Sequence, residues 1–361
     1  MKLLNIERDT LLKPLQAVSG IVERRHTLPI LSNVLLEIAN SELNLLATDL
    51  EIQVATKASL NESANAQAIT VSARKLQDIL RSLPDEATVS LETQESKLVL
   101  RAGKSRFNLQ TLPAEDFPRL AQGTGEVATV SVAQKNLKRM LQLVQYAMAQ
   151  QDIRYYLNGL LLLVDADKLT LVATDGHRLA CISTALEEKQ PRAEAILPRK
   201  AVLELVKLLA ETDDIVELQI QQNQVRTRFG SVDLLSKVVD GKFPDFTRVI
   251  PSDPPGRFVI PRTELQQALQ RASILSNEKF RGVRWVLTKD LLRIVCTNAE
   301  QEEAEEELEV GYAGEPLDIG FNVTYLLDVL NNLSADQVEC ALGDANSSML
   351  MTVPGEENFK Y

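Results

Sequence analysis

Hydrophobic positions along this chain recur with two periods, one helical and one typical of strands. Apolar residues at i, i+3, i+4 and i+7 predict an amphipathic helix, and strict alternation predicts a strand with one buried face. The helical period predicts helices over residues 11–18, 72–83, 135–150, 199–209, 265–272 and 323–333. Strands are predicted at 33–38, 88–92, 98–101, 159–164, 216–220, 225–229, 283–288, 338–342 and 349–353. Ser72 and Asn322 are expected to cap two of the helices.

These elements form three diverged copies of one unit. A short motif after an apolar strand reads LLATDL at 45–50, LVATDG at 171–176 and IVCTNA at 294–299, at spacings of 126 and then 123 residues. Each copy repeats helix, strands, helix, strands, with about eight strands, and Phe-Pro pairs at 117–118 and 243–244 close the first two copies. The predicted fold is α+β, with two helices packed on antiparallel sheets in each copy. Turn-rich joins predict domains at 1–125, 126–253 and 254–361.

The composition limits the class of protein. A chain of 361 residues with 45% hydrophobic and 25% charged residues is typical of a globular protein of two or three domains. No apolar run approaches the roughly 20 residues that cross a bilayer, and the first residues lack the apolar core of a signal peptide. Cys181, Cys296 and Cys340 show no CxxC spacing, and only His26 and His177 are histidines. A disulfide framework and a metal centre are therefore not expected, and a reducing cytoplasm fits.

Charge is distributed unevenly. The net charge of −11 argues against a protein that grips DNA by neutralising phosphates. Acids are densest at residues 300–309, whereas the predicted helices carry many cations. These helix cations are Arg74, Lys75, Arg81, Lys135, Lys138, Arg139, Arg199, Lys200, Lys207, Arg262 and Arg271. Such segregation allows a basic surface within an acidic body, although ordinary solvated helix faces would look the same.

Two further segments have complementary charge. Residues 104–109 are basic, with apolar positions spaced by two. The complementary segment of the third copy consists of the apolar Ile274 and Leu275 and a separate acidic run. The acidic run consists of Glu302, Glu303, Glu305 and Glu306. Edges of this kind can join head to tail, as a closed ring or as a filament. A lysine-rich edge strand is also a common protection against aggregation. Lys104 and Arg106 alone therefore do not distinguish a subunit contact from a protected edge strand.

Several segments carry a family resemblance. They read TLPIL at 27–31, DIRYYLNG at 152–159, TDGHRL at 174–179, DGKFPD at 240–245, SNEKFRGVR at 276–284 and GFNV at 320–323. Together they resemble the bacterial sliding clamps, the β subunit of DNA polymerase III, over essentially the whole chain. The resemblance implies half of a closed ring: a homodimer of six similar domains, with helices around duplex DNA and sheets outside. It implies no catalysis and no cofactor, a clamp loader that opens the ring, and a polymerase and other partners that dock short peptides.

The resemblance also implies roles for individual residues. For a peptide-binding groove these are Arg154, Leu157, Thr174, Gly176, His177, Arg178, Leu179, Pro244, Val249, Asn322, Tyr325 and Ser348. Near DNA they are Arg25, Gln151, Tyr155, Tyr156 and Lys200, and at the dimer contact Arg106, Phe107, Leu109, Ile274 and Leu275. Members of the family continue past the position of Tyr361 with a short apolar strand and a tail that helps to form the groove. We therefore expect a truncated sequence here, and an end at Tyr361 would put the peptide affinity in question.

Ring closure removes the objection raised by the net charge. A ring keeps DNA in place topologically, so modest, salt-sensitive contacts without base specificity are sufficient. A negative exterior then limits binding of nucleic acid outside the hole. In the groove, apolar side chains would hold hydrophobic anchors of an extended peptide, and Arg154, His177 and Arg178 would orient it.

Two other classes of protein also fit parts of the sequence. Asp175, His177 and Arg178 could form an acid–base site, but no nucleophile motif, P-loop or HExxH accompanies them. Asp49 also recurs at the equivalent position without a histidine, so the aspartate is interpreted as a turn residue. A scaffold built of repeats without nucleic acid is the other alternative, and retention on circular but not on linear DNA would distinguish it from a clamp.

Overall fold

The computed structural model describes residues 2–23, 27–123 and 127–361. The chain folds into two compact units, Met1–Lys138 with Gln190–Val239, and Arg139–Lys189 with Asp240–Tyr361. The predicted boundary after residue 125 and the predicted DNA contact Arg25 lie outside the described residues.

The helices lie where the hydrophobic period predicts them. The described ranges contain α1 (Arg8–Ser19), α2 (Ala73–Ser82), α3 (Gln134–Val144), α4 (Arg199–Leu208), α5 (Arg262–Ser273) and α6 (Val323–Asn332). Their apolar stripes are buried, as Leu11 and Leu15 of α1 illustrate with no exposed surface. α3 ends earlier than predicted, because the chain tightens into a 3₁₀ turn at Gln145–Ala147.

The two predicted helix caps have different outcomes. The Asn322 side chain accepts a hydrogen bond from the Thr324 amide at 2.9 Å, which confirms it as the N-cap of α6. Ser72 occupies the N-cap position of α2, but its side chain makes no capping hydrogen bond. The prediction was therefore right about the position of Ser72 and wrong about its interaction.

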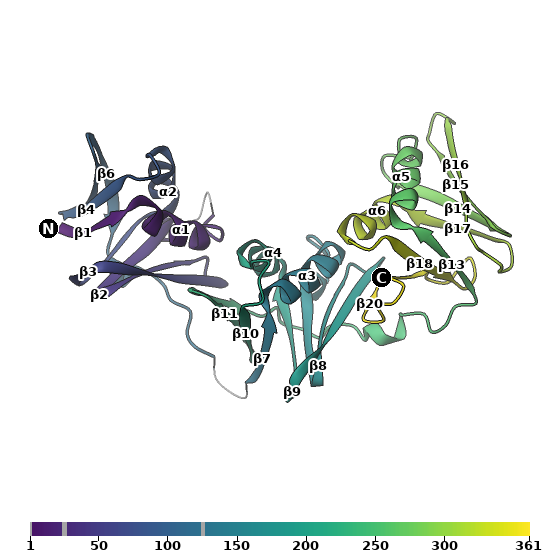
Figure 1. Ribbon diagram of the computed structural model, residues 1–361, viewed down its shortest axis with the longest axis horizontal. Coiled ribbons are helices and arrows are strands. Elements are labelled where there is room, and N and C mark those ends of the chain that lie inside the picture. Colours follow the sequence, from purple (N-terminus) through teal and green to yellow (C-terminus); the bar gives the residue numbers. More distant parts are fainter. Residues whose placement is uncertain (1, 24–26, 124–126) are drawn as a thin grey trace. The chain divides into compact units, whose positions relative to one another are not determined.

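The first unit holds one large antiparallel sheet. Its strands are β1 (Lys2–Glu7), β2 (Asn33–Thr48), β3 (Ile52–Ser72), β4 (Thr88–Gln94), β5 (Lys97–Ala102), β6 (Ser105–Leu112), β7 (Ala128–Ala133), β10 (Ile215–Ile220), β11 (Gln224–Phe229) and β12 (Val232–Lys237). The order is β1-β4-β5-β6-β3-β12-β11-β10-β7, and β2 pairs with β3. Within this unit α1 packs against α2 and against β2 and β3 (Figure 1). The β12–β3 pairing joins the first two copies of the repeat.

The number of strands in the first copy differs from the prediction. We expected about eight, whereas the described residues of the first copy form six strands, β1 to β6, of which β2 and β3 are long. The reason is that β2 and β3 continue through register shifts near Asn40 where separate strands were expected.

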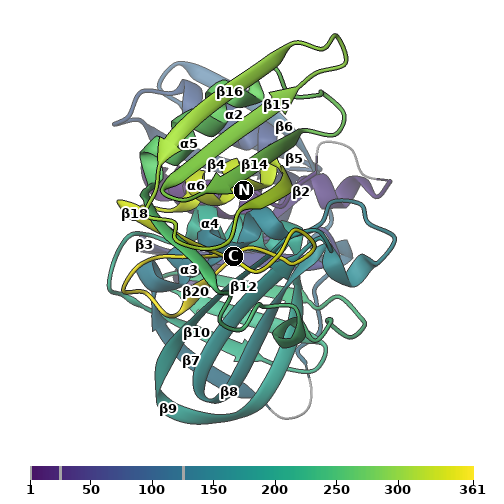
Figure 2. The ribbon, with the colours of Figure 1, turned by 90° about the vertical axis from the view of Figure 1, so that its right-hand side faces the viewer.

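The second unit holds three smaller antiparallel sheets. Its strands are β8 (Gly159–Thr174), β9 (Leu179–Pro198), β13 (Gly256–Pro261), β14 (Gly282–Thr288), β15 (Leu291–Thr297), β16 (Glu303–Glu309), β17 (Leu317–Asn322), β18 (Gln337–Leu342), β19 (Leu350–Thr352) and β20 (Phe359–Lys360). The orders are β16-β15-β14-β17, β13-β18-β19 and β20-β9-β8. Figure 2 shows β16 and β15 side by side, with β16 at the edge of its sheet. β9 runs on from this unit into the first one.

The end of the described chain is held firmly in the second unit. Phe359 is fully buried and pairs with Ile182 of β9. The backbone of Tyr361 exchanges two hydrogen bonds with Met351 of β19, at 2.8 and 3.0 Å. This short segment therefore connects β9 of the second copy with β19 of the third. No helix within the described ranges is long and apolar enough to cross a membrane.

Candidate functional site

A tight turn between β8 and β9 forms one wall of the site. Asp175 Oδ1 accepts hydrogen bonds from the amides of His177 and Arg178, at 2.9 and 3.0 Å. The Thr174 hydroxyl donates to the Arg178 carbonyl at 2.6 Å and accepts from the Gly176 amide at 3.1 Å. Asp175 thus uses its carboxylate to build the turn.

The first copy of the repeat contains the same turn between β2 and β3. Asp49 Oδ1 accepts from the amides of Glu51 and Ile52, at 3.0 and 2.7 Å, and the Thr48 hydroxyl donates to the Ile52 carbonyl at 2.8 Å. The residue after the aspartate has a positive φ in both turns, +76° at Leu50 and +89° at Gly176. Because the same bonds form without a histidine in the first copy, the interpretation of the aspartate as a turn residue is confirmed.

Arg178 connects this turn to α6 and to the segment after α3. Its guanidinium group donates to Asp175 Oδ2 at 3.0 Å, to Asp328 Oδ2 at 2.6 Å and to the Tyr146 carbonyl at 2.6 Å. The same group lies 4.4 Å from the centre of the Tyr325 ring, a cation–π contact. Burial alone would lower the pKa of Arg178, but the hydrogen bond and charge of Asp328 raise it overall. Arg178 is therefore a fixed cation, tied to the protein on several sides.

Arg154 is a second cation at the turn, and it is held differently. Its guanidinium group donates to both oxygens of Asp152, at 3.0 and 2.9 Å, and to the Asp175 carbonyl at 3.2 Å. The hydrogen bonds from Arg154 lower the pKa of Asp152 to about 2. A Cβ atom on Gly176 would lie 2.9 Å from the Arg154 guanidinium, so the glycine allows this close approach. Arg154 remains exposed and available to a ligand.

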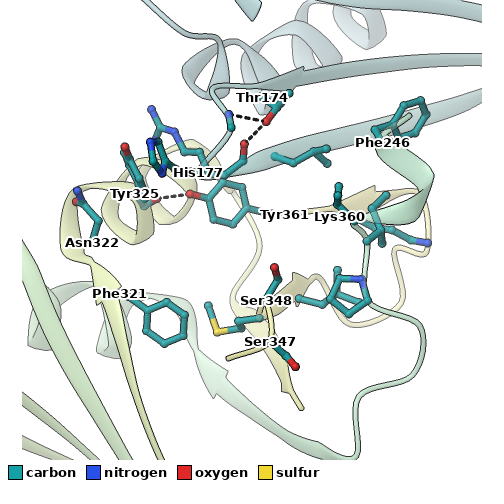
Figure 3. A pocket seen from close by; sticks show the side chains of 18 of the residues that line it. Thr174, His177, Phe246, Phe321, Asn322, Tyr325, Ser347, Ser348, Lys360 and Tyr361 are labelled. Carbon is teal, nitrogen blue, oxygen red and sulfur yellow. Dashed lines mark hydrogen bonds between the residues drawn. The ribbon is translucent and has the colours of Figure 1, made fainter. Parts of the chain in front are cut away.

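Arg154, Gly176 and Arg178 line one open groove of about 760 Å³ within the second unit (Figure 3). The volume lies in the range of ligand sites, roughly 300 to 1,000 Å³. All twelve residues that we expected in a peptide-binding groove line it. The His177 and Tyr325 rings stack at its edge, with centroids 6.4 Å apart. The structure thus brings together residues from turns, loops and helices of two copies of the repeat.

Other lining residues were missed by the sequence analysis. They are Tyr156, Asp245, Phe246, Ile250, Pro251, Ile319, Gly320, Phe321, Leu326, Ala345, Asn346, Ser347, Met349, Leu350, Lys360 and Tyr361. Tyr156 had been assigned to the DNA side. Tyr361 lies in the groove and donates its hydroxyl hydrogen bond to the Tyr325 carbonyl at 2.8 Å (Figure 3). Burial raises the pKa of Tyr361 well above its usual range, so the phenol stays neutral. No single periodic pattern marks these positions, because half of them lie in loops and the others are spread over several short elements.

The predicted DNA-facing lysines on α3 and α4 all carry an acidic partner. Lys135 pairs with Asp213 at 2.6 Å and Lys138 with Glu211 at 3.0 Å. Lys200 contacts both Asp49 and Glu23, at 2.6 and 3.0 Å, and Lys207 contacts the buried Glu204 at 3.2 Å. Arg139 pairs with Glu356. These cations are thus partly neutralised within the chain.

The remaining DNA-facing candidates vary in exposure. Arg74 and Lys75 of α2 are exposed and make no ion pair among the described residues. Arg199 is half-buried at the start of α4. Gln151 has a positive φ of +55°, and the neighbouring Tyr155 is 57% exposed.

Two arginines of the third copy differ from the expectation of a basic helix face. Arg262 donates to the carbonyl of Ala335, just after α6, at 2.9 Å and to that of Leu330, in the last turn of α6, at 3.1 Å. Arg271 forms a double hydrogen bond with Glu306 of β16, at 2.8 and 2.6 Å. Both arginines are therefore bound within the chain, by carbonyls near the end of α6 and by a neighbouring strand.

The candidate dimer residues lie in different units. In the first unit Arg106 is exposed, Phe107 is half-buried and Leu109 is 8% exposed. In the second unit Ile274 is 78% exposed, and Leu275 beside it is half-buried. The acids lie on or before the edge strand β16, and most are already in contact within the chain. Glu302 accepts from Asn298, Glu305 pairs with Arg293 and Glu306 with Arg271, while Glu303 is exposed.

Comparison with known proteins covers the whole chain. Residues 1–121, 131–245 and 247–361 match the N-terminal, central and C-terminal domains of the DNA polymerase III beta subunit. The beta sliding clamp of Pseudomonas putida is 48% identical and that of Escherichia coli K12 44%, each with 99% of this chain and 97% of the relative aligned. The crystal structure of the sliding clamp from Pseudomonas aeruginosa bound to griselimycin is 47% identical. It superposes with a TM-score of 0.96 over 99% of this chain and 97% of that one.

Proposed function

The chain belongs to the DNA polymerase III beta subunit family, the bacterial sliding clamps, and we propose that its groove beside Arg178 is where partner proteins dock short peptides. Like other members of the family, the chain is a non-catalytic processivity factor of DNA replication. Sliding clamps form a ring around duplex DNA and tether the polymerase and other partners to it. In this proposal, the side chains of the groove bind the partners and so tether them to the ring.

The observation that carries the proposal is the combination of apolar walls and fixed polar groups in one groove. Leu157 and Leu179 form part of the apolar lining, and Val249 is 59% exposed at its rim. Such a surface gains free energy by burying hydrophobic anchors of an extended peptide. Arg154 and His177 are exposed and can hydrogen-bond the backbone or an acidic side chain of the ligand. The Pseudomonas aeruginosa clamp bound to griselimycin supports a ligand-binding site in a clamp of this sequence class.

Titration of fluorescent peptides tests the docking site. A five- to ten-residue peptide with two hydrophobic anchors should bind the intact protein, and the same peptide with both anchors replaced by serine should not. Equal binding of both peptides would refute an apolar groove as the docking site. Competition between the peptide and a polymerase would then show whether both use the same place.

We also propose where DNA and the second subunit bind. Cations of α2, α3 and α4, together with Gln151 and Tyr155, would face DNA, and Ile274 with Leu275 would meet the 106–109 strip of a second chain. Domain boundaries after residues 125 and 253 accompany this arrangement, as does a location in the cytoplasm, where the chromosome is replicated. The DNA contacts would be independent of sequence, because phosphates carry no base identity.

Loading onto a nicked plasmid tests the ring. Protein loaded by a clamp loader should run with the circular DNA on a gel-filtration column. Cutting the plasmid once should release it, because a topological link is lost at a free end. Retention that survives linearisation would contradict topological binding.

A further inference from the structure

A five-residue loop after α4 is anchored to the start of α3. We call residues 210–214 the acidic loop, since they read Ala-Glu-Thr-Asp-Asp. The Asp214 and Thr212 carbonyls accept from the amides of Gln134 and Lys135, at 2.9 and 3.0 Å. The buried Gln134 side chain accepts in turn from the Ala210 amide at 3.0 Å. Because backbone groups on both sides hold it, the position of the acidic loop depends little on its carboxylates.

The acidic loop places two carboxylates on the cations of α3. Asp213 Oδ1 lies 2.6 Å from Lys135 Nζ, and Glu211 Oε1 lies 3.0 Å from Lys138 Nζ. The Lys138 side chain is only 19% exposed, while Glu211 and Asp213 are 70% and 79% exposed. The third acid behaves differently, since the Asp214 carboxylate accepts from the Thr212 hydroxyl at 2.9 Å and forms no ion pair in the described chain.

The other two copies of the repeat differ from this arrangement. In the first copy, Asp85 of the equivalent loop pairs with Arg8 at the start of α1, at 2.6 Å. In both of these copies the residue equivalent to Gln134 is an arginine, and its side chain donates to a carbonyl in the last turn of the second helix, Arg8 to Leu80 at 2.7 Å and Arg262 to Leu330 at 3.1 Å. The backbone anchor is kept, since the Arg8 and Arg262 amides donate to Ala87 and Asp336 at 2.8 Å. Among the described residues, the second copy differs from the first because its loop pairs two carboxylates with lysines, whereas the first copy pairs one carboxylate with the arginine at the helix start. The pairing is therefore a separate feature of α3, added to an anchor common to all three copies.

We propose that Glu211 and Asp213 occupy the places that DNA phosphates would take on Lys135 and Lys138, and so weaken the contact of α3 with DNA. This inference rests on the proposed function, in which α3 faces DNA. Both carboxylates are largely exposed, and ion pairs with solvent-exposed partners contribute little to stability, so a phosphate can displace each carboxylate. A phosphate gains less free energy by displacing a carboxylate than by binding an unpaired lysine. The reason is that the lysine–carboxylate pair has to be broken and that fewer counterions are released. The acidic loop thus keeps the ring mobile on DNA.

Single-molecule tracking of loaded protein on duplex DNA tests this directly, and the chain offers a matched control. Asp213→Asn and Asp214→Asn change the charge equally, one residue apart, but only Asp213 is paired with a lysine. We expect Asp213→Asn to slow one-dimensional diffusion about twofold, and Glu211→Gln with Asp213→Asn about fourfold, with a steeper dependence on salt. Asp214→Asn should match the unmodified protein. Equal effects of the two single variants would overturn the proposal, since long-range charge would explain them, and so would no effect of either.

A second set of variants, in which the two lysines are replaced, distinguishes failure of this inference from failure of the proposed function. With Lys135→Gln and Lys138→Gln, the further change of Glu211 and Asp213 should have no effect on diffusion. A persisting effect would overturn the proposed competition. Release of the unmodified protein from linearised plasmid is read independently, so topological binding can hold while the competition fails. Thermal unfolding of each variant verifies that the acidic loop is still anchored.

Discussion

Arg178 Nη1 donates a hydrogen bond to Asp328 Oδ2 over 2.6 Å, across 150 residues of sequence. The bond joins the turn after β8 in the second copy to α6 in the third. The arginine side chain is 11% exposed and that of the aspartate 34%. One ion pair therefore fixes the wall of the groove that two copies of the repeat build together.

Replacing Arg178 by Ala should loosen that wall. Asp328 and the Tyr146 carbonyl would both lose a charged donor, and we expect α6 to lose about 2 kcal/mol of local stability. Native-state hydrogen exchange of the α6 amides measures this loss. Arg154→Ala is the matched control, because its exposed pair with Asp152 should leave the same amides unchanged. Equal protection in both variants would contradict a structural role of Arg178.

Gly176 should not tolerate a side chain. Alanine at a φ of +89° is strained, and its Cβ would also lie 2.9 Å from the Arg154 guanidinium. We expect Gly176→Ala to cost about 1 to 2 kcal/mol and to weaken peptide binding by displacing Arg154. Gly230→Ala is the control, since its φ is +52° and no atom lies within 4 Å of the added carbon. It should show strain without any change in peptide titrations.

Local periodicity was sufficient to predict the helices and the repeat. The stripe through Leu11 and Leu15 and its counterpart through Leu265 and Leu269 lie on buried helix faces, because burial of a helix requires that spacing. Likewise, the recurrence of Thr-Asp at 48–49 and 174–175 corresponds to one hydrogen-bonded turn in both copies. These features are local, so neighbouring residues determine them.

Pairing between distant side chains was beyond such an analysis. The helix α3 carries no acidic residue of its own, yet Lys135 and Lys138 meet acids more than seventy residues later. Arg262 looked like a surface cation and instead donates to the end of α6. Tyr361 lies in the groove because β20 pairs with β9 and because the Tyr361 backbone pairs with Met351 of β19. Contacts of this kind depend on tertiary structure, and a single sequence does not display them.

The apolar wall of the groove should dominate peptide affinity. Leu157 is 2% exposed beneath the surface and Leu179 lies half-buried beside it. Replacing both by Ala removes apolar contact area, and we expect peptides to bind several-fold more weakly. Gel filtration should still show a dimer, because neither side chain belongs to the proposed subunit contact. Unchanged titrations would refute a role for these two leucines.

The exposed Ile274 should decide whether two chains associate. An isoleucine that is 78% exposed on a folded chain gains about 1.5 to 3 kcal/mol when a partner covers it. Ile274→Asp should therefore shift the protein from dimer to monomer in light-scattering measurements at low micromolar concentration. Ile215→Asp provides the control, since that side chain is 59% exposed on β10, away from the proposed contact. Loss of the dimer in both variants would point to general destabilisation.

The ion pair between Asp152 and Arg154 should be lost only in strong acid. The hydrogen bonds from Arg154 lower the pKa of Asp152 from 3.8 to about 2, so folding favours the ionised carboxyl. This contribution is fully present above pH 3.8 and is lost as the pH falls towards 2. Carbon-detected NMR of the carboxyl should show a midpoint near 2, and Arg154→Gln should move it towards 3.8. A midpoint near 3.8 in the unmodified protein would mean that Arg154 is free in solution, and the groove would then lack one of its oriented cations.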